Sequence, residues 1–206
     1  MNAYRMIMYV LAVIGLAAPS LFGGGLDLEK PEWEKLFAGE AIVRQVSNPN
    51  RVPGIRLAFI VAAPREDIWK ALTDYRNFPR IFKGTQSAKV KKQGANWTDV
   101  EIVFKKKSMG FINLTYKYVF HREYHPEEQR LTWQRLKGDF SVIEGFWQVS
   151  DTDRPGHLLL VYESYLDGQW FFPARIVRNA ALKEAVDMSA NVRDWVENKM
   201  KKEENR

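Results

Sequence analysis

Residues 61–82, VAAPREDIWKALTDYRNFPRIF, decide the fold class of this chain. The stretch begins at the end of an alternating apolar segment, 55–62, whose period of two predicts a strand. Pro64 then starts a helix, because no N–H is needed in the first turn, and the two acidic residues after it stabilise the positive end of the helix dipole. This helix can end at Thr73, and a second short helix is expected over 75–82.

Downstream of this unit, the chain reads almost entirely as β-strand until residue 166. Strands are expected at 85–92, 97–107, 111–125, 130–136, 140–149 and 158–166, joined by short turns. Pro173 then opens a long amphipathic helix from Ala174 to about residue 201. An antiparallel meander followed by one long helix predicts an α+β fold in which the sheet curls around the C-terminal helix.

Together with GFW at 145–147, LVY at 160–162 and Pro173, the stretch 61–82 resembles the START-like (SRPBCC, helix-grip) superfamily. The nearest branch is the polyketide-cyclase and coenzyme-Q-binding group. The resemblance implies a curved antiparallel sheet wrapped around a long C-terminal helix, with two short helices after the first core strand and a hydrophobic cavity inside. Members mostly bind lipids, quinones, sterols or polyketides; only some are enzymes, and they share no catalytic motif.

The N-terminal segment differs from the rest of the chain. Arg5 precedes an apolar run from Met6 to Ala18, and small residues follow, which is the pattern of a secretory signal peptide. The run is just short of a bilayer span, so an uncleaved membrane anchor is the alternative. We expect a signal peptide or anchor at 1–25, a lead-in segment at 26–54, the START-like domain at 55–200 and a charged tail at 201–206. The folded domain is expected outside the cytoplasm, periplasmic or membrane-tethered.

Composition excludes several kinds of chemistry. The chain has no Cys, so disulfides, zinc–thiolate sites and cysteine nucleophiles are ruled out. His121, His125 and His157 lie on strands or next to turns and do not converge with other ligands, so neither a metal site nor a cofactor is expected. The formal net charge of +6 could favour an anionic membrane surface, whereas export and the lack of a recognisable motif argue against nucleic acid. The sequence indicates no particular oligomeric state.

Aromatic side chains on the expected inner faces of the strands are the candidate walls of a cavity. Small residues on the last helix would leave space opposite them. The predicted cavity residues are Phe104, Tyr116, Tyr118, Trp133, Trp147, Tyr162, Ala181 and Ala185. The alternative is that these side chains fill a solid core, since close packing is the default in protein interiors.

Two smaller groups of residues are candidates for an entrance and for catalysis. Trp170, Phe172 and Arg175 lie just before the last helix or at its start, and we expect them at the cavity entrance, although the aromatics could instead be core. Glu144 is the one candidate acid–base, with Glu163 a weaker second. A carboxylate inside an apolar cavity would have a raised pKa and could move protons. The alternative is that both carboxylates point outward.

Three functions from different classes remain at this stage. The first is binding of a hydrophobic, lipid-like ligand by a carrier or chaperone outside the cytoplasm, with no chemistry performed. The second is a cyclase or aromatase acting on a polyketide-like substrate, with Glu144 or a tyrosine moving protons. The third is a protein-interaction module at the membrane.

Overall fold

The computed structural model describes residues 27–47, 52–108, 112–168 and 174–199, which form a sheet of eight strands with helices on both faces. The strands are β1 (Ile42–Val46), β2 (Gly54–Val61), β3 (Thr85–Gln93), β4 (Trp97–Ser108), β5 (Ile112–His125), β6 (Arg130–Gly138), β7 (Phe140–Asp151) and β8 (Leu158–Gly168). The α-helices are α1 (Lys30–Phe37), α2 (Arg65–Thr73), α3 (Phe78–Ile81) and α4 (Ala174–Asp194). A 3-10 turn, Tyr75–Asn77, joins α2 to α3, a second one, Pro126–Glu128, joins β5 to β6, and a π-helical turn, Trp195–Lys199, extends α4.

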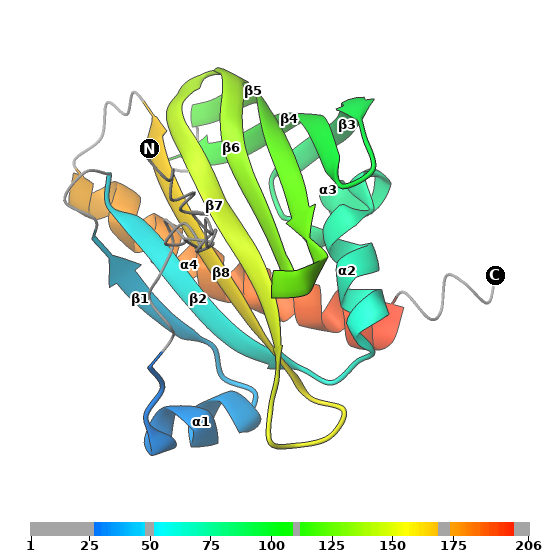
Figure 1. Cartoon of the computed structure of the whole chain (residues 1–206). Coiled ribbons are helices and arrows are strands. Elements are labelled where there is room, and N and C mark those ends of the chain that lie inside the picture. Colours follow the sequence, from blue (N-terminus) through cyan, green and yellow to red (C-terminus); the bar gives the residue numbers. More distant parts are fainter. Residues whose placement is uncertain (1–26, 48–51, 109–111, 169–173, 200–206) are drawn as a thin grey trace, which may run out of the picture.

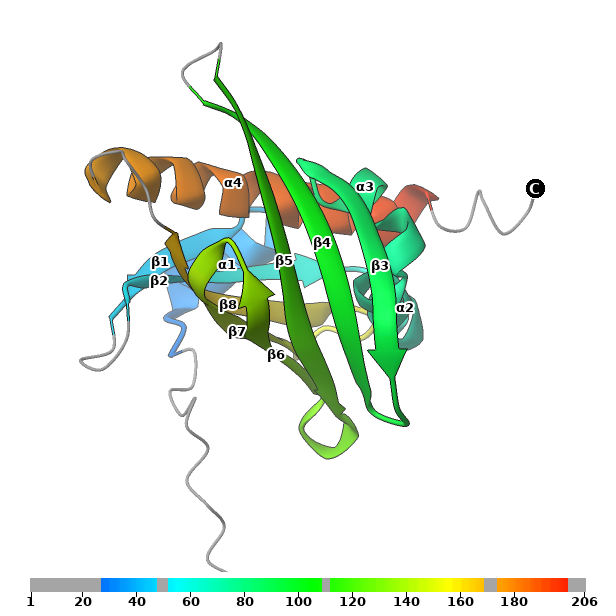
Figure 2. The ribbon, with the colours of Figure 1, turned by 90° about the horizontal axis from the view of Figure 1, so that it is seen from above.

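The sheet is antiparallel throughout, with the strand order β1-β2-β8-β7-β6-β5-β4-β3. Strands β3 to β8 follow one another as a meander, and β2 closes the arrangement by pairing with the last strand, β8. The sheet is strongly curved, and α4 runs across its hollow side, as Figures 1 and 2 show. This is the sheet-around-helix arrangement that the sequence predicts.

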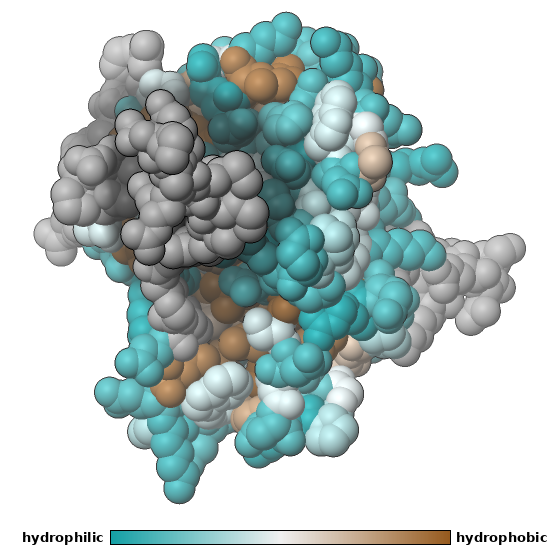
Figure 3. Space-filling view, in the orientation of Figure 1, coloured by the Kyte–Doolittle hydropathy of each residue, from teal (hydrophilic) through white to brown (hydrophobic). Residues whose placement is uncertain are grey.

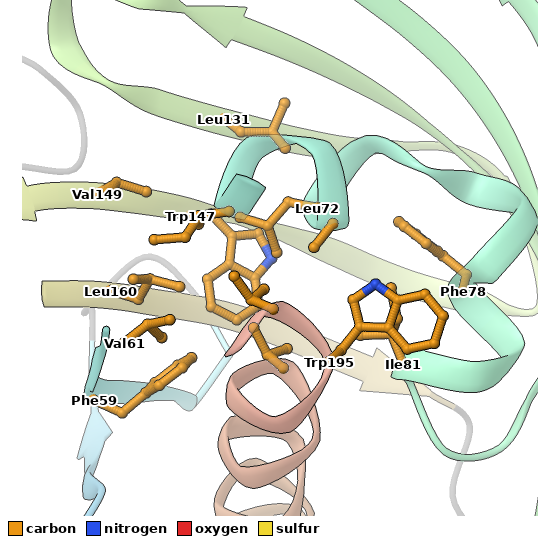
Figure 4. Close-up of a cluster of buried hydrophobic side chains, with 14 of the residues drawn as sticks. Phe59, Val61, Leu72, Phe78, Ile81, Leu131, Trp147, Val149, Leu160 and Trp195 are labelled. Carbon is orange, nitrogen blue, oxygen red and sulfur yellow. The ribbon is translucent and has the colours of Figure 1, made fainter. Parts of the chain in front are cut away.

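One end of the interior is a closely packed core. Trp195 and the last turns of α4 pack against α2, α3 and the strands β2, β7 and β8 (Figure 4). Phe59, Leu72 and Leu160 are completely buried there. Burial of large apolar side chains is the main favourable term in folding, so this end anchors α4 to the sheet.

The other face of the sheet carries a second, smaller core beneath α1. Leu36 of α1 is buried together with five sheet residues of the same cluster, Ala58, Ile60, Phe146, Leu159 and Val161. Arg44 of β1 holds α1 from the side, because its Nη2 lies 2.6 Å from both carboxylate oxygens of Glu32. Apolar side chains are visible where α1 meets the sheet, on a face that is otherwise largely hydrophilic (Figure 3).

The elements agree with the sequence expectations in type and order. The strand expected at 55–62 is β2, the helix after Pro64 is α2, and the expected second helix is a 3-10 turn followed by the single turn α3. The lead-in expected at 26–54 supplies α1 and β1, and β1 is an edge strand of the same sheet. Within the described ranges, no helix is both long enough and apolar enough to cross a bilayer.

Candidate functional site

The register of the strands shows which side chains face α4. Cross-strand partners in an antiparallel sheet share a face. Arg122 of β5 pairs with Trp133 of β6, Trp133 with Gly145 of β7, and Gly145 with Ser164 of β8. This row lies on the face that packs against α4, because Trp133 belongs to the same buried cluster as Ala185 of α4. We call it the inner face, and the side covered by α1 the outer face.

Gly145 leaves room for the Trp133 ring to pack against the neighbouring strand. A Cβ at this position would lie 2.0 Å from the carbonyl oxygen of Glu163 and 2.7 Å from the Trp133 ring. Only a residue without a side chain therefore fits between the Trp133 indole and the neighbouring strand. The consequence is that the indole lies flat along the inner face instead of standing away from it.

Two groups of stacked aromatic rings line the inner face. Tyr162 lies between two indoles, with ring centroids 5.4 Å from Trp133 and 4.7 Å from Trp147. Phe140 contacts both Tyr116 and Tyr118, at centroid distances of 5.1 and 5.2 Å. These separations are typical of favourable ring pairs, so the walls of the interior are formed by mutually supporting aromatic groups.

Tyr118 and Tyr162 are desolvated by burial and yet keep accessible surface. Desolvation by burial is the main cause that raises the pKa of both phenols, as expected for groups deep inside the protein. Both side chains nevertheless keep part of their surface accessible, unlike the sealed core around Phe59. Accessible surface on a ring means that a water molecule can reach part of it.

The inner-face row of side chains becomes exposed near the end of β8. Ile143 of β7 pairs with Leu166 of β8, and this pair continues the inner-face row by two residues. Leu166 is 40% exposed although it is an aliphatic residue on the side of the core. The expected entrance residues Trp170 and Phe172 follow directly along the chain.

Arg122 brings a positive charge to the inner face. Its side chain is 4% exposed, and its Nη1 donates a hydrogen bond of 2.8 Å to the carbonyl oxygen of Leu72. The guanidinium also lies over the rings of Tyr75, Phe78 and Phe120, at 5.3 to 5.7 Å from their centroids. Burial lowers the pKa of Arg122, and interactions with Tyr75, Tyr118 and Tyr162 oppose that shift.

Ser164 and Glu184 complete the polar groups around Tyr162. After the dominant effect of burial, a hydrogen bond with Ser164 lowers the pKa of the Tyr162 phenol, Arg122 lowers it further, and the charge of Glu184 on α4 raises it. Ser164 is buried, whereas the Glu184 side chain is exposed. The inner face thus presents hydroxyl and guanidinium donors among aromatic rings.

The two candidate acid–base carboxylates lie on the outer face. Glu144 pairs with Tyr165 and Glu163 with Phe146, one residue out of step with the inner-face row. Glu163 is 2% exposed, and it accepts hydrogen bonds from Arg56 Nε at 2.5 Å and from the Tyr165 hydroxyl at 2.9 Å. Their outward position is the alternative that the alternation of the strands left open.

The structure places the predicted cavity residues as follows. Trp133, Trp147 and Ala185 are buried in the inner cluster, and Phe104, Tyr118 and Tyr162 are partly buried against it. Tyr116 is stacked on Phe140. Trp170 and Phe172 lie outside the described residues, and Arg175 and Ala181 belong to α4 but their side chains lie outside the described part.

Sequence reasoning missed Arg122 and Ser164. The signal was present: Tyr116, Tyr118 and Phe120 set a period of two, and the next inward position is Arg122. A charged residue in register with an apolar face is rare unless it has a partner or a role. Three or more residues arranged to hold a metal ion are not found in the described portion of the chain.

Comparison with solved structures identifies the fold. The structure resembles a STAR-related lipid transfer protein from Xanthomonas axonopodis, with a TM-score of 0.64, 11% identity, and coverage of 76% of this chain and 93% of that one. It also resembles the lipid transfer and protein localization domain of human StarD13 (0.63; 12% identity; 77% and 85% covered). A third match is the Zhui aromatase/cyclase from Streptomyces sp. R1128 (0.59; 16% identity; 77% and 96% covered).

Sequence comparison identifies the family. No curated protein matches the chain. The family model described as polyketide cyclase / dehydrase and lipid transport matches residues 61–193, which include the opening stretch, all of β3 to β8 and most of α4. The chain therefore belongs to the polyketide cyclase / dehydrase and lipid transport family, and its fold is the START-like helix grip.

Proposed function

We propose that this protein binds a hydrophobic, lipid-like ligand between the sheet and α4 and releases it unchanged, as a carrier or chaperone. The observation that carries the proposal is the pair Tyr118 and Tyr162, whose rings are desolvated and yet retain accessible surface. A ligand chain in this space would replace water next to aromatic walls. Each buried methylene contributes about 0.8 kcal/mol, so a medium-length acyl chain supports micromolar affinity after ordering costs.

Among the described residues, the placement of the candidate bases favours a carrier over a cyclase. Cyclisation needs a group that removes a proton, and the raised pKa values of Tyr118 and Tyr162 keep both phenols protonated at neutral pH. Glu144 and Glu163 lie on the outer face. Glu184 is exposed on α4, so its carboxylate retains its hydration. The matched structures include both lipid transfer proteins and an aromatase/cyclase, so the similarity alone is compatible with either function.

Native mass spectrometry of the full chain, purified from a lipid-containing host, tests the proposal. We expect a co-purified mass that organic extraction removes, and uptake of added fatty acid by the emptied protein. Tryptophan fluorescence gives a second signal, because Trp133 and Trp147 both contact the Tyr162 ring. A protein that is empty and takes up no fatty acid, quinone or sterol would contradict the carrier function and favour a protein-interaction role.

A matched pair of variants separates carrier from enzyme. Glu144→Gln changes an outer-face carboxylate, and we expect it to bind ligand as the wild type does. Tyr162→Phe removes a hydroxyl from the inner face and should weaken uptake of a ligand with a polar end. Recovery of a chemically altered ligand from the wild type but not from Glu144→Gln would instead support the cyclase.

We further propose that the domain acts outside the cytoplasm, bound to or near a membrane surface. The basic start, the apolar run from Met6 to Ala18 and the net charge of +6 support this location. The test is a fusion in which residues 1–30, with Arg5 retained, precede a reporter that is active only after export. Reporter activity equal to that of a fusion lacking residues 1–25 would contradict export.

A further inference from the structure

Among the described residues, Arg122 carries a buried charge that has no ionic partner. The side chain is 4% exposed, and among the ion pairs of the described residues none involves Arg122. Outside the described ranges, only Glu203 and Glu204 carry side-chain carboxylates, and both lie in the C-terminal tail. A buried charge is normally paired, so the missing negative charge is a property of the interior that requires an explanation.

Part of the charge is balanced by the local structure. Leu72 belongs to the last turn of α2, and the carbonyl groups there form the negative end of the helix dipole. The rings of Tyr75, Phe78 and Phe120 add cation–π attraction. These interactions supply about half an elementary charge and ring faces, whereas they provide no anion for the fork of guanidinium donors.

Arg122 lies on the inner face, which is the face where the ligand is proposed to bind. It shares a cross-strand row with Trp133, Gly145 and Ser164. Against the larger effect of burial, its guanidinium lowers the pKa of the Tyr118 and Tyr162 phenols, and these phenols in turn raise the pKa of Arg122. The inner face therefore has a packed end near α2, where Arg122 donates a hydrogen bond to the carbonyl oxygen of Leu72, and an aromatic remainder that includes Tyr118 and Tyr162.

We propose that Arg122 is the recognition site for a carboxylate at the end of the hydrophobic ligand, with the hydroxyl groups of Tyr118 and Tyr162 as neighbouring donors. This inference rests on the proposed binding function and specifies the class of ligand as a fatty acid or a similar long-chain carboxylic acid. The planar guanidinium matches the two oxygens of a carboxylate, and such charge-assisted pairs are among the strongest hydrogen-bonded contacts.

A ligand series of constant chain length tests this proposal on the wild-type protein. Laurate, methyl laurate, lauryl alcohol and dodecylamine share an apolar chain and differ in the charge of the end group. We expect dissociation constants in the order laurate, then the two neutral ligands, then the amine, with laurate at least about tenfold tighter than the alcohol. Equal affinities for laurate and lauryl alcohol would overturn the recognition of a carboxylate and leave the binding function intact. Failure of all four ligands to bind would overturn the binding function itself.

Two variants at the same position complete the test. Arg122→Gln should lose most of the preference for laurate over lauryl alcohol. Arg122→Lys keeps the charge and should retain a preference, reduced because a single ammonium cannot bind both oxygens in a fork. If Arg122 only caps α2, both variants lower the melting temperature and leave the ratio of the two affinities unchanged, which contradicts the proposal. The wild-type series decides the question even if a variant fails to fold.

Discussion

The two faces of the sheet differ in how their buried polar groups are partnered. On the outer face, Glu163 is matched by Arg56 and Tyr165 of the same chain, at 2.5 and 2.9 Å. On the inner face, Arg122 and Tyr162 present donors, and no carboxylate of the described residues is ion-paired with Arg122.

This difference separates groups that stabilise the fold from groups available to a ligand. A buried ion pair that is complete within the chain ties two strands together, and it offers nothing to a partner. Donors that border an accessible space retain the capacity to bind an acceptor brought by another molecule. The contrast predicts that outer-face changes act on stability and inner-face changes act on binding.

The largest expected effect is on the outer face. Glu163→Gln leaves Arg56 as a largely buried cation without its ionic partner. We expect the free energy of unfolding to fall by about 3–5 kcal/mol, measured by urea denaturation, with no change in the relative affinities of laurate and lauryl alcohol in the folded fraction. Arg56→Met combined with Glu163→Met is the control, since removal of both charges should restore much of the stability.

The second effect links the two faces through Gly145. An alanine Cβ would collide with the backbone of Glu163 and with the Trp133 ring. We expect Gly145→Ala to lower the stability by about 2 kcal/mol and to weaken ligand binding, because the indole that lies against Tyr162 is displaced. Gly156→Ala is the control, because that glycine has open space around it in a loop, although its positive φ of 76° carries a small strain cost. A Gly145→Ala protein with normal affinity would show that Trp133 is not part of the ligand wall.

The third effect is a loss of stability in alkali. The pKa values of Tyr118 and Tyr162 are raised above the ordinary value of 10.0 in the folded protein, so the unfolded chain releases these protons first. Their stabilising contribution is complete below about pH 10 and falls as the pH rises toward the folded pKa values. Denaturation curves at several alkaline pH values should show this fall. The double variant Tyr118→Phe, Tyr162→Phe should lose less stability over the same range, and an identical fall in both proteins would argue against buried phenols.

The smallest effect on stability, with a clear effect on binding, is expected for Ser164→Leu. A larger side chain that fills accessible space next to Tyr162 costs less than about 1 kcal/mol, while overpacking of a solid core costs about 1–3 kcal/mol. We expect reduced uptake of laurate together with a nearly unchanged melting temperature. A strongly destabilised variant would indicate that the interior is already full.

The fold was predictable because its signals are local and repeated. Pro64 with its acidic neighbours, the alternation over 111–125 and the apolar stripe after Pro173 each specify one element, and all three agree with the structure. The same period of two in the later strands predicted that Trp133, Trp147 and Tyr162 face inward, and all three lie in or against the inner core.

The site was only partly predictable because it depends on register. Glu144 follows inward-facing Ile143, so a shift of one residue decides between cavity and surface, and neighbouring residue types did not settle it. Arg122 was visible as an inward position of its strand, but its lack of a carboxylate partner depends on segments far apart in the sequence. Local pattern carries no information about such distant pairings.

The measurement that most directly tests the central claim is a set of isotope-filtered NOE experiments on the protein with bound laurate. The account predicts contacts from the methylene protons to the rings of Tyr118, Tyr162 and Trp147, with the carboxyl end nearest Arg122. Contacts confined to outer-face residues such as Phe146 and Tyr165, or no contacts at saturating laurate, would contradict a ligand-binding interior.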